Sequence, residues 1–319
     1  MAFINEELRY PSSNGKDTIT AQIWYDDAVS PLCIVQIVHG MNEYMGRYED
    51  FARFLTQNGF IVCGNDHTGH GKSKGEDGYG YFGDRDGNLV LVNDVRAMND
   101  LIAKRYPRLG VVMLGHSMGS FICRSYITKY GGELSGIILS GTAGPNPLAS
   151  IGLFLSRAIM LVKGPKHKSA FLNNMAFGHY NDRFEEKRTK ADWLTRDTAI
   201  VDKYSADEMC TFVFTAGGYH DLLKLIKEIS SKKWAGEVPH NVPYLVFSGS
   251  MDPVGGFTKG VSVVYDRLKA AGVKNIILKI YEGGRHEMLN DTEKATVYSD
   301  ILGWINRVIA NKAAETAKK

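Results

Sequence analysis

MLGHSMG, at residues 113–119, places one serine between two glycines directly after an apolar run. The surrounding residues indicate a strand at 110–117 and a helix at 118–131, because a β-branched run gives way to helical apolar spacing. A GxSxG sequence at such a junction makes a sharp turn that raises the serine hydroxyl above the sheet. The two glycines let strand and helix approach closely, since they have no side chains. We therefore interpret Ser117 as a candidate nucleophile, with an ordinary glycine-rich turn as the alternative.

Short β-branched runs alternate with longer helical patterns along most of the chain. Strands are predicted at 18–25, 33–40, 60–67, 110–117, 136–144, 242–250 and 275–283, and helices at 44–59, 89–106, 118–131, 257–272 and 292–310. This alternation predicts an α/β fold with a mostly parallel central sheet flanked by helices.

The alternating pattern is interrupted once. Between Pro145 and Asn241 the spacing is irregular and helical, and strand spacing returns only afterwards. We therefore expect a core formed by residues 1–144 and 242–319, with a helical cap inserted at 145–241. The final stretch, NKAAETAKK, is expected to fray.

Composition excludes several classes of protein. The chain has 319 residues, of which 44% are hydrophobic and 23% charged, and its formal net charge of +3 predicts no nucleic-acid partner. The N-terminal residues have no apolar run of the kind found in signal peptides, and no run is long enough to span a membrane. The four cysteines form no CxxC pair that would indicate metal or redox chemistry, and we interpret them as buried free thiols of a reducing compartment. A cytoplasmic location is therefore expected, and the sequence indicates no oligomeric state.

A serine nucleophile needs a histidine base, and that base needs an acid to orient it. In GxSxG proteins of this fold class, the acid and the histidine follow later strands in that order. Asp252 comes directly after the predicted strand at 242–250. Of the nine histidines, His286 alone follows a late strand, at 275–283. We predict a triad of these two residues with Ser117; the alternatives are a turn aspartate before proline and an exposed loop histidine.

The tetrahedral intermediate of acyl transfer also needs an oxyanion hole made of two N–H groups. One is expected from Met118, which follows the nucleophile at the start of a helix. The other is expected from Met41, because Gly40 allows the early loop to turn its backbone inward. Only backbone groups are used at either position.

The loop DHTGHGKSKG, at 66–75, contains the GKS that ends a phosphate-binding P-loop. A P-loop requires glycine five positions before the glycine of GKS, and Asp66 stands there instead. We interpret the loop as structural, with Asp66 and His67 packing beneath the site.

Five motifs together resemble the monoacylglycerol lipase and lysophospholipase group of α/β hydrolases, which are S33-type hydrolases. They are HGMNEYMGRYEDFA at 39–52, DHTGHGKSKG at 66–75, GHSMGS at 115–120, GSMDPVGG at 249–256 and GGRHEML at 283–289. The resemblance implies the α/β-hydrolase fold, the triad and oxyanion hole just described, and an acyl ester substrate. It also implies that Glu43 and Arg47 brace the oxyanion loop. Tyr44 stands where some relatives carry histidine, and residues 193–223 resemble the cap of bacterial lysophospholipases.

The expected protein is a serine hydrolase that cleaves carboxylic esters, of monoacylglycerol or lysophospholipid, through an acyl-enzyme on Ser117. It requires no cofactor and no metal. A short-chain carboxylesterase or an S33-type aminopeptidase would use the same triad, whereas a binding module would have lost it. The apolar run at 147–168 carries basic flanks. It is expected either to touch lipid surfaces transiently or to pack its apolar face on the core.

Overall fold

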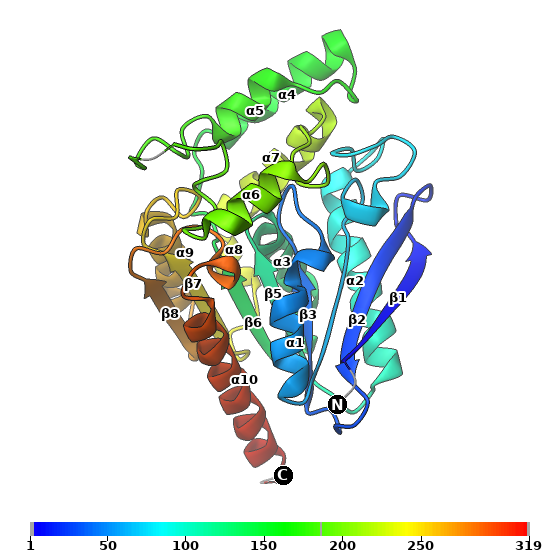
Figure 1. The fold of residues 1–319 in the computed structure, drawn as a ribbon, viewed down its shortest axis with the longest axis vertical. Helices are drawn as coiled ribbons and strands as arrows, with labels where there is room; N and C mark the ends of the chain where they lie inside the picture. Colours follow the sequence, from blue (N-terminus) through cyan, green and yellow to red (C-terminus); the bar gives the residue numbers. More distant parts are fainter. Residues whose placement is uncertain (1–2, 186, 318–319) are drawn as a thin grey trace.

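The computed structural model describes residues 3–185 and 187–317. Within these residues an eight-stranded sheet has the order β1-β2-β4-β3-β5-β6-β7-β8 (Figure 1). The strands are β1 Phe3–Pro11, β2 Thr18–Asp26, β3 Cys33–Val38, β4 Phe60–Asn65, β5 Val111–His116, β6 Gly136–Ser140, β7 Tyr244–Gly249 and β8 Ile276–Tyr281. Strands β3 to β8 are parallel, and β1 and β2 are antiparallel to their neighbours. The predicted mostly parallel sheet is confirmed.

Helices cover both faces of the sheet, which is why the central strands are buried along their whole length. The core helices are α1 Glu49–Gln57, α2 Gly87–Arg105, α3 Met118–Tyr130, α9 Lys259–Ala270 and α10 Lys294–Ala317, with short 3₁₀ turns η1 Met45–Tyr48, η2 Gly71–Ser73, η3 Gly131–Glu133 and η4 Met288–Asn290. Alternate residues of β3 enter different cores. Ile34 belongs to the core that includes residues of α2, α3 and α9, whereas Val35 belongs to the core that includes residues of α1 and α10.

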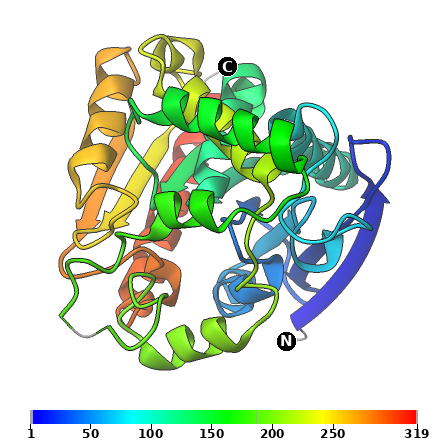
Figure 2. The ribbon, with the colours of Figure 1, turned by 90° about the horizontal axis from the view of Figure 1, so that it is seen from above.

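In the part of the chain that the structure describes, five helices lie between β6 and β7. They are α4 Ala149–Lys163, α5 Ala170–Phe177, α6 Thr198–Ala206, α7 Ala216–Ser230 and α8 Trp234–Glu237. In the view from above, α4 and α5 cross over the sheet (Figure 2). Helix α7 packs against α4 on one side and against α2 and α3 on the other. Its buried residues Leu225 and Ile229 belong to the main core, so α7 joins the inserted helices to the sheet domain.

Two features of the structure differ from the sequence predictions. β1 is an additional antiparallel edge strand, which the prediction missed because its partly exposed glutamates interrupt the hydrophobic pattern. The C-terminal segment is helical over 311–317, because α10 continues to Ala317; residues 318–319 lie outside the described part. Lys312 Nζ donates a hydrogen bond to Ser135 Oγ at 2.9 Å and holds this end of the helix to the domain.

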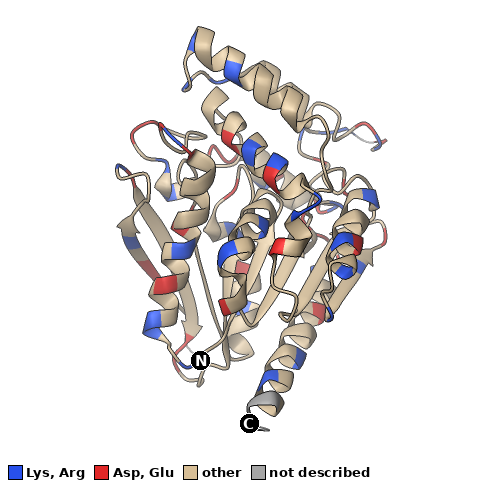
Figure 3. Ribbon diagram, turned by 180° about the vertical axis from the view of Figure 1, so that it is seen from behind, with Lys and Arg blue, Asp and Glu red and all other residues tan. Residues whose placement is uncertain are grey.

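Basic and acidic residues are interspersed along the ribbon of the core (Figure 3). In the described part of the chain, every helix is too short or too polar to cross a lipid bilayer.

Candidate active site

Ser117 lies at the sharp turn between β5 and α3. Its φ of 52° and ψ of −122° are unusual for a residue with a side chain. Both neighbouring glycines are necessary here, because a Cβ at Gly119 would lie 1.9 Å from the Val38 carbonyl oxygen and one at Gly115 would lie 2.6 Å from the Gly119 oxygen. The Ser117 N–H donates to the Ser140 carbonyl at 2.9 Å and ties the turn to β6.

Asp252 and His286 lie on the loops after β7 and β8, and both are buried. The His286 Nδ1 atom is 2.9 Å from Asp252 Oδ1. The carboxylate also accepts hydrogen bonds from Ser248 Oγ at 2.7 Å and from the Val254 N–H at 2.9 Å. The structure thus brings together the acid and the histidine that were predicted from the sequence, and three donors orient the carboxylate.

Burial and charge act in opposite directions on this pair. Burial lowers the pKa of His286, but the Asp252 charge and hydrogen bond outweigh it, so the pKa of His286 is raised. Burial likewise raises the pKa of Asp252, and His286 with the other donors lowers it below its ordinary value. An ionised carboxylate at Nδ1 holds the ring proton there and leaves Nε2 as the proton acceptor.

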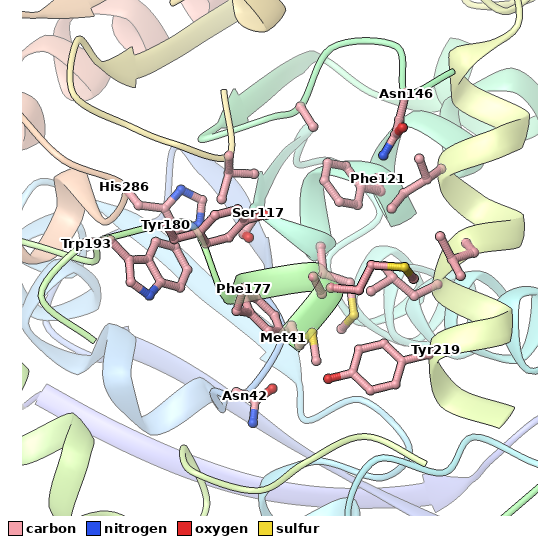
Figure 4. A pocket seen from close by; sticks show the side chains of 18 of the residues that line it. Met41, Asn42, Ser117, Phe121, Asn146, Phe177, Tyr180, Trp193, Tyr219 and His286 are labelled. Atoms are coloured by element: carbon pink, nitrogen blue, oxygen red, sulfur yellow. The ribbon is translucent and has the colours of Figure 1, made fainter. Parts of the chain in front are cut away.

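Ser117 and His286 line a cavity of about 410 Å³ beneath the inserted helices. They lie next to each other at one end of it, with Trp193 beside them (Figure 4). Among the described residues no hydrogen bond joins the Ser117 hydroxyl to the His286 ring. The Trp193 and His286 ring centroids are 5.0 Å apart. The remaining wall is largely apolar and includes Phe121, Leu148, Ile151, Leu172, Met175 and Ile226.

The two backbone N–H groups predicted for the oxyanion hole border the same cavity. Met41 and Met118 both line it, and neither N–H donates to another residue in the described ranges. A Cβ at Gly40 would lie 3.0 Å from the Ser117 Cβ, so the early loop passes directly beside the nucleophile. The Gly40 N–H donates to Glu43 Oε1, which fixes the loop one residue before Met41.

A buried cluster links the early loop to the histidine loop. Arg47 donates to both carboxylate oxygens of Glu287, at 2.8 and 2.7 Å, and to Glu43 Oε2 at 3.1 Å. Burial raises the pKa of Glu43. Burial also favours the protonated form of Glu287, but Arg47 outweighs this and lowers the pKa of Glu287. Glu43 and Arg47 were predicted from the sequence, whereas Glu287 was not, because its only signal is its position directly after His286.

The other histidines near the site are buried and neutral. The His116 ring centroid is 4.7 Å from that of His286, and burial lowers the pKa of His116 to about 3. The His67 N–H donates to His39 Nε2 at 3.0 Å.

Asp66 accepts the N–H of Met45 and that of Lys72, each at 2.8 Å, and so supports the early loop from below. No group of three metal-ligating side chains is found within the described residues.

Segments of the inserted region contact the histidine loop. The Glu287 N–H donates to the Leu194 carbonyl at 2.6 Å, and the His286 N–H donates to the Trp193 carbonyl at 3.4 Å. Arg285 donates to the carbonyls of Asp192 and Thr195. Trp193 therefore stands over His286 because its own backbone is bonded to the histidine loop, a relation with no signal in the sequence.

The chain matches the family described as serine aminopeptidase, S33, over residues 30–293. It is 30% identical to the monoacylglycerol lipase of Mycolicibacterium smegmatis, covering 90% of this chain and 92% of that protein, and 28% identical to the monoglyceride lipase of Homo sapiens, covering 87% and 84%. A thermostable carboxyl esterase from Bacillus coagulans, solved with glycerol, superimposes with a TM-score of 0.90 at 32% identity over 97% of this chain and 99% of that one. The chain therefore belongs to the serine aminopeptidase S33 family, in the monoacylglycerol lipase-like group of α/β hydrolases.

Proposed function

We propose that the protein hydrolyses the ester bond of a monoacylglycerol or a lysophospholipid through an acyl-enzyme on Ser117. It is a carboxylic ester hydrolase of its family. One observation supports the long-chain substrate above all: the cavity at Ser117 and His286 continues into a largely apolar chamber under the inserted helices. Such a wall suits an acyl chain, because each buried methylene contributes about 0.8 kcal/mol.

The proposed mechanism assigns one role to each residue. Ser117 Oγ attacks the ester carbonyl while His286 Nε2 takes its proton, and Asp252 stabilises the imidazolium that forms. The N–H groups of Met41 and Met118 donate to the oxyanion. His286 then protonates the departing alcohol. Water then attacks the acyl-enzyme while His286 takes its proton, and the fatty acid is released from Ser117.

Residues 145–241 are proposed to act as the cap that admits the acyl chain, over a core of 1–144 and 242–319. This division is supported by the position of α4 and α5 across the sheet (Figure 2) and by their residues in the chamber wall. A cytoplasmic location is part of the same proposal, since the four cysteines are free and buried.

The cap is further proposed to touch lipid aggregates transiently through α4. This helix turns its small residues Ala149, Gly152 and Ser156 inward, whereas Leu161 and Val162 are 81% and 82% exposed. Phe154, Ile151 and Leu148 are also exposed, and the two charged residues of the helix are both basic. An apolar face with basic flanks suits an anionic lipid surface better than water.

Lipid contact predicts co-sedimentation with anionic vesicles at low salt. Replacing Phe154 and Leu161 by serine is expected to reduce the bound fraction, because it removes two exposed apolar side chains from α4. Absence of binding by the unchanged protein would contradict lipid contact and leave the ester chemistry untouched.

The activity is tested with a matched substrate panel and Ser117→Ala. The panel contains monoacylglycerols, lysophosphatidylcholine, p-nitrophenyl esters from acetate to palmitate, and an aminoacyl anilide. We expect turnover of long-chain monoesters, lowered by about six powers of ten in Ser117→Ala, since the triad acts as a unit. Turnover of acetate and butyrate alone would indicate a short-chain carboxylesterase, and turnover of the anilide an aminopeptidase. A fluorophosphonate that failed to label Ser117 would contradict a serine hydrolase.

A further inference from the structure

The cap rests on the oxyanion loop as well as on the substrate chamber. We call residues 204–212, from the end of α6 to Phe212, the latch segment. Two hydrogen bonds reach it from the loop: Asn42 Nδ2 donates to the Phe212 carbonyl, and the Tyr44 hydroxyl donates to Asp207 Oδ2 at 2.9 Å. The Arg47 guanidinium lies over the Tyr204 ring, 4.9 Å from its centroid. Three side chains of one short loop therefore contact one segment of the cap.

These contacts complete the support of Met41. On its N-terminal side, the Gly40 N–H is held by Glu43. On its C-terminal side, Asn42 has a φ of 58°, in the left-handed region, which asparagine adopts more readily than most residues. The hydrogen bond from its side chain to the Phe212 carbonyl ties Asn42 to the latch segment and so supports this backbone conformation. The backbone that carries the Met41 N–H is thus fixed from the core on one side and from the cap on the other.

Tyr44 does not border the substrate cavity, so we expect it to affect catalysis through its contact with the latch segment. Asn42 lines the substrate cavity, next to Met41 (Figure 4), so a change there could alter substrate contacts directly. Tyr44 and Asp207 do not border that cavity. The bond between them joins the loop to the cap without reaching the reacting atoms.

We infer that the latch segment positions the oxyanion loop, with Asn42 and Tyr44 as positioning residues. The contact between the latch segment and the oxyanion loop then affects kcat on every ester. This includes an acetate ester, whose acyl chain is too short to enter the apolar chamber. This inference rests on the proposed function, in which the Met41 N–H binds the oxyanion. It assigns the cap a role in transition-state stabilisation in addition to admitting the substrate.

The test compares Tyr44→Phe with Tyr281→Phe. Each removes one tyrosine hydroxyl that donates to an aspartate at 2.9 Å, but Tyr281 bonds Asp300 of α10, which belongs neither to the oxyanion loop nor to the latch segment. Loss of one oxyanion donor costs 10²- to 10³-fold in kcat, so displacement of the loop is expected to lower kcat on p-nitrophenyl acetate about tenfold, with KM within about twofold. Tyr281→Phe should leave both parameters unchanged.

Asn42→Gly provides a second variant. Glycine keeps the left-handed conformation accessible but removes the bond to the Phe212 carbonyl. A fall in acetate kcat in both Tyr44→Phe and Asn42→Gly supports the inference. Unchanged acetate kcat with a raised KM for long-chain esters alone would overturn it, because the cap would then act only in substrate binding.

A readout other than turnover separates this inference from the proposed function. Hydrogen exchange of the amides at 39–44 should be faster in Tyr44→Phe than in wild type and Tyr281→Phe, since the loop loses its contact with the cap. Unchanged exchange would refute the inference whatever the substrate. Faster exchange in a protein without turnover on any ester would refute the proposed function alone.

Discussion

At the scale of single residues, the pair of His286 and Asp252 determines how the rate depends on pH. The base must be neutral to accept the Ser117 proton, so kcat/KM should rise with pH through the pKa of His286, which the carboxylate holds above its ordinary value. Asp252→Asn is expected to shift this rise in kcat/KM to lower pH, because burial then lowers the pKa of His286 without the opposing charge. It should also lower kcat by about 10⁴. Profiles of kcat/KM and kcat against pH for both proteins measure the two effects. If kcat/KM rose at the same pH in both, the assignment of His286 as the base would be contradicted.

Glu287 makes a residue-scale contribution to stability. Its pKa is lowered in the folded protein, so its contribution is present above the ordinary glutamate pKa and is lost as the pH falls through the folded value. Glu287→Gln leaves Arg47 with one carboxylate partner and is expected to cost about 3 kcal/mol at pH 7. Urea unfolding between pH 3 and 7 measures this. Equal stability of variant and wild type at pH 7 would show that the ion pair contributes nothing.

At the scale of elements, the junction of β5 and α3 depends on the absence of a side chain at Gly119. A Cβ there would meet the Val38 carbonyl oxygen at 1.9 Å, so Gly119→Ala must move α3 away from the sheet. We expect a loss of about 3 kcal/mol in the free energy of unfolding. Gly132→Ala is the matched control, because a Cβ at Gly132 meets no atom within 4 Å. Similar urea midpoints for the two variants would contradict a steric requirement at the turn.

At the scale of the whole molecule, the chamber between cap and core should determine acyl-chain length. Ile226 enters the chamber from α7, the helix packed against both α4 and the sheet domain. Ile226→Trp shortens the chamber and leaves no space for the last four methylenes of a long acyl chain. At about 0.8 kcal/mol per methylene, such an ester should be disfavoured about 200-fold relative to acetate. Competition between palmitate and acetate esters measures the ratio. An unchanged ratio would exclude this end of the cavity as the acyl site.

The turn at Ser117 could be predicted from the amino-acid sequence, as could the mostly parallel sheet and the positions of Asp252 and His286 after later strands. These features depend on local backbone geometry and hydrophobic periodicity, which a short stretch of chain carries. Only the tertiary structure revealed Glu287 opposite Arg47, 240 residues away, and Asp207 against Tyr44, 163 residues away. Such contacts arise where irregular loops pack together, so no periodic pattern in the sequence records which loop meets which.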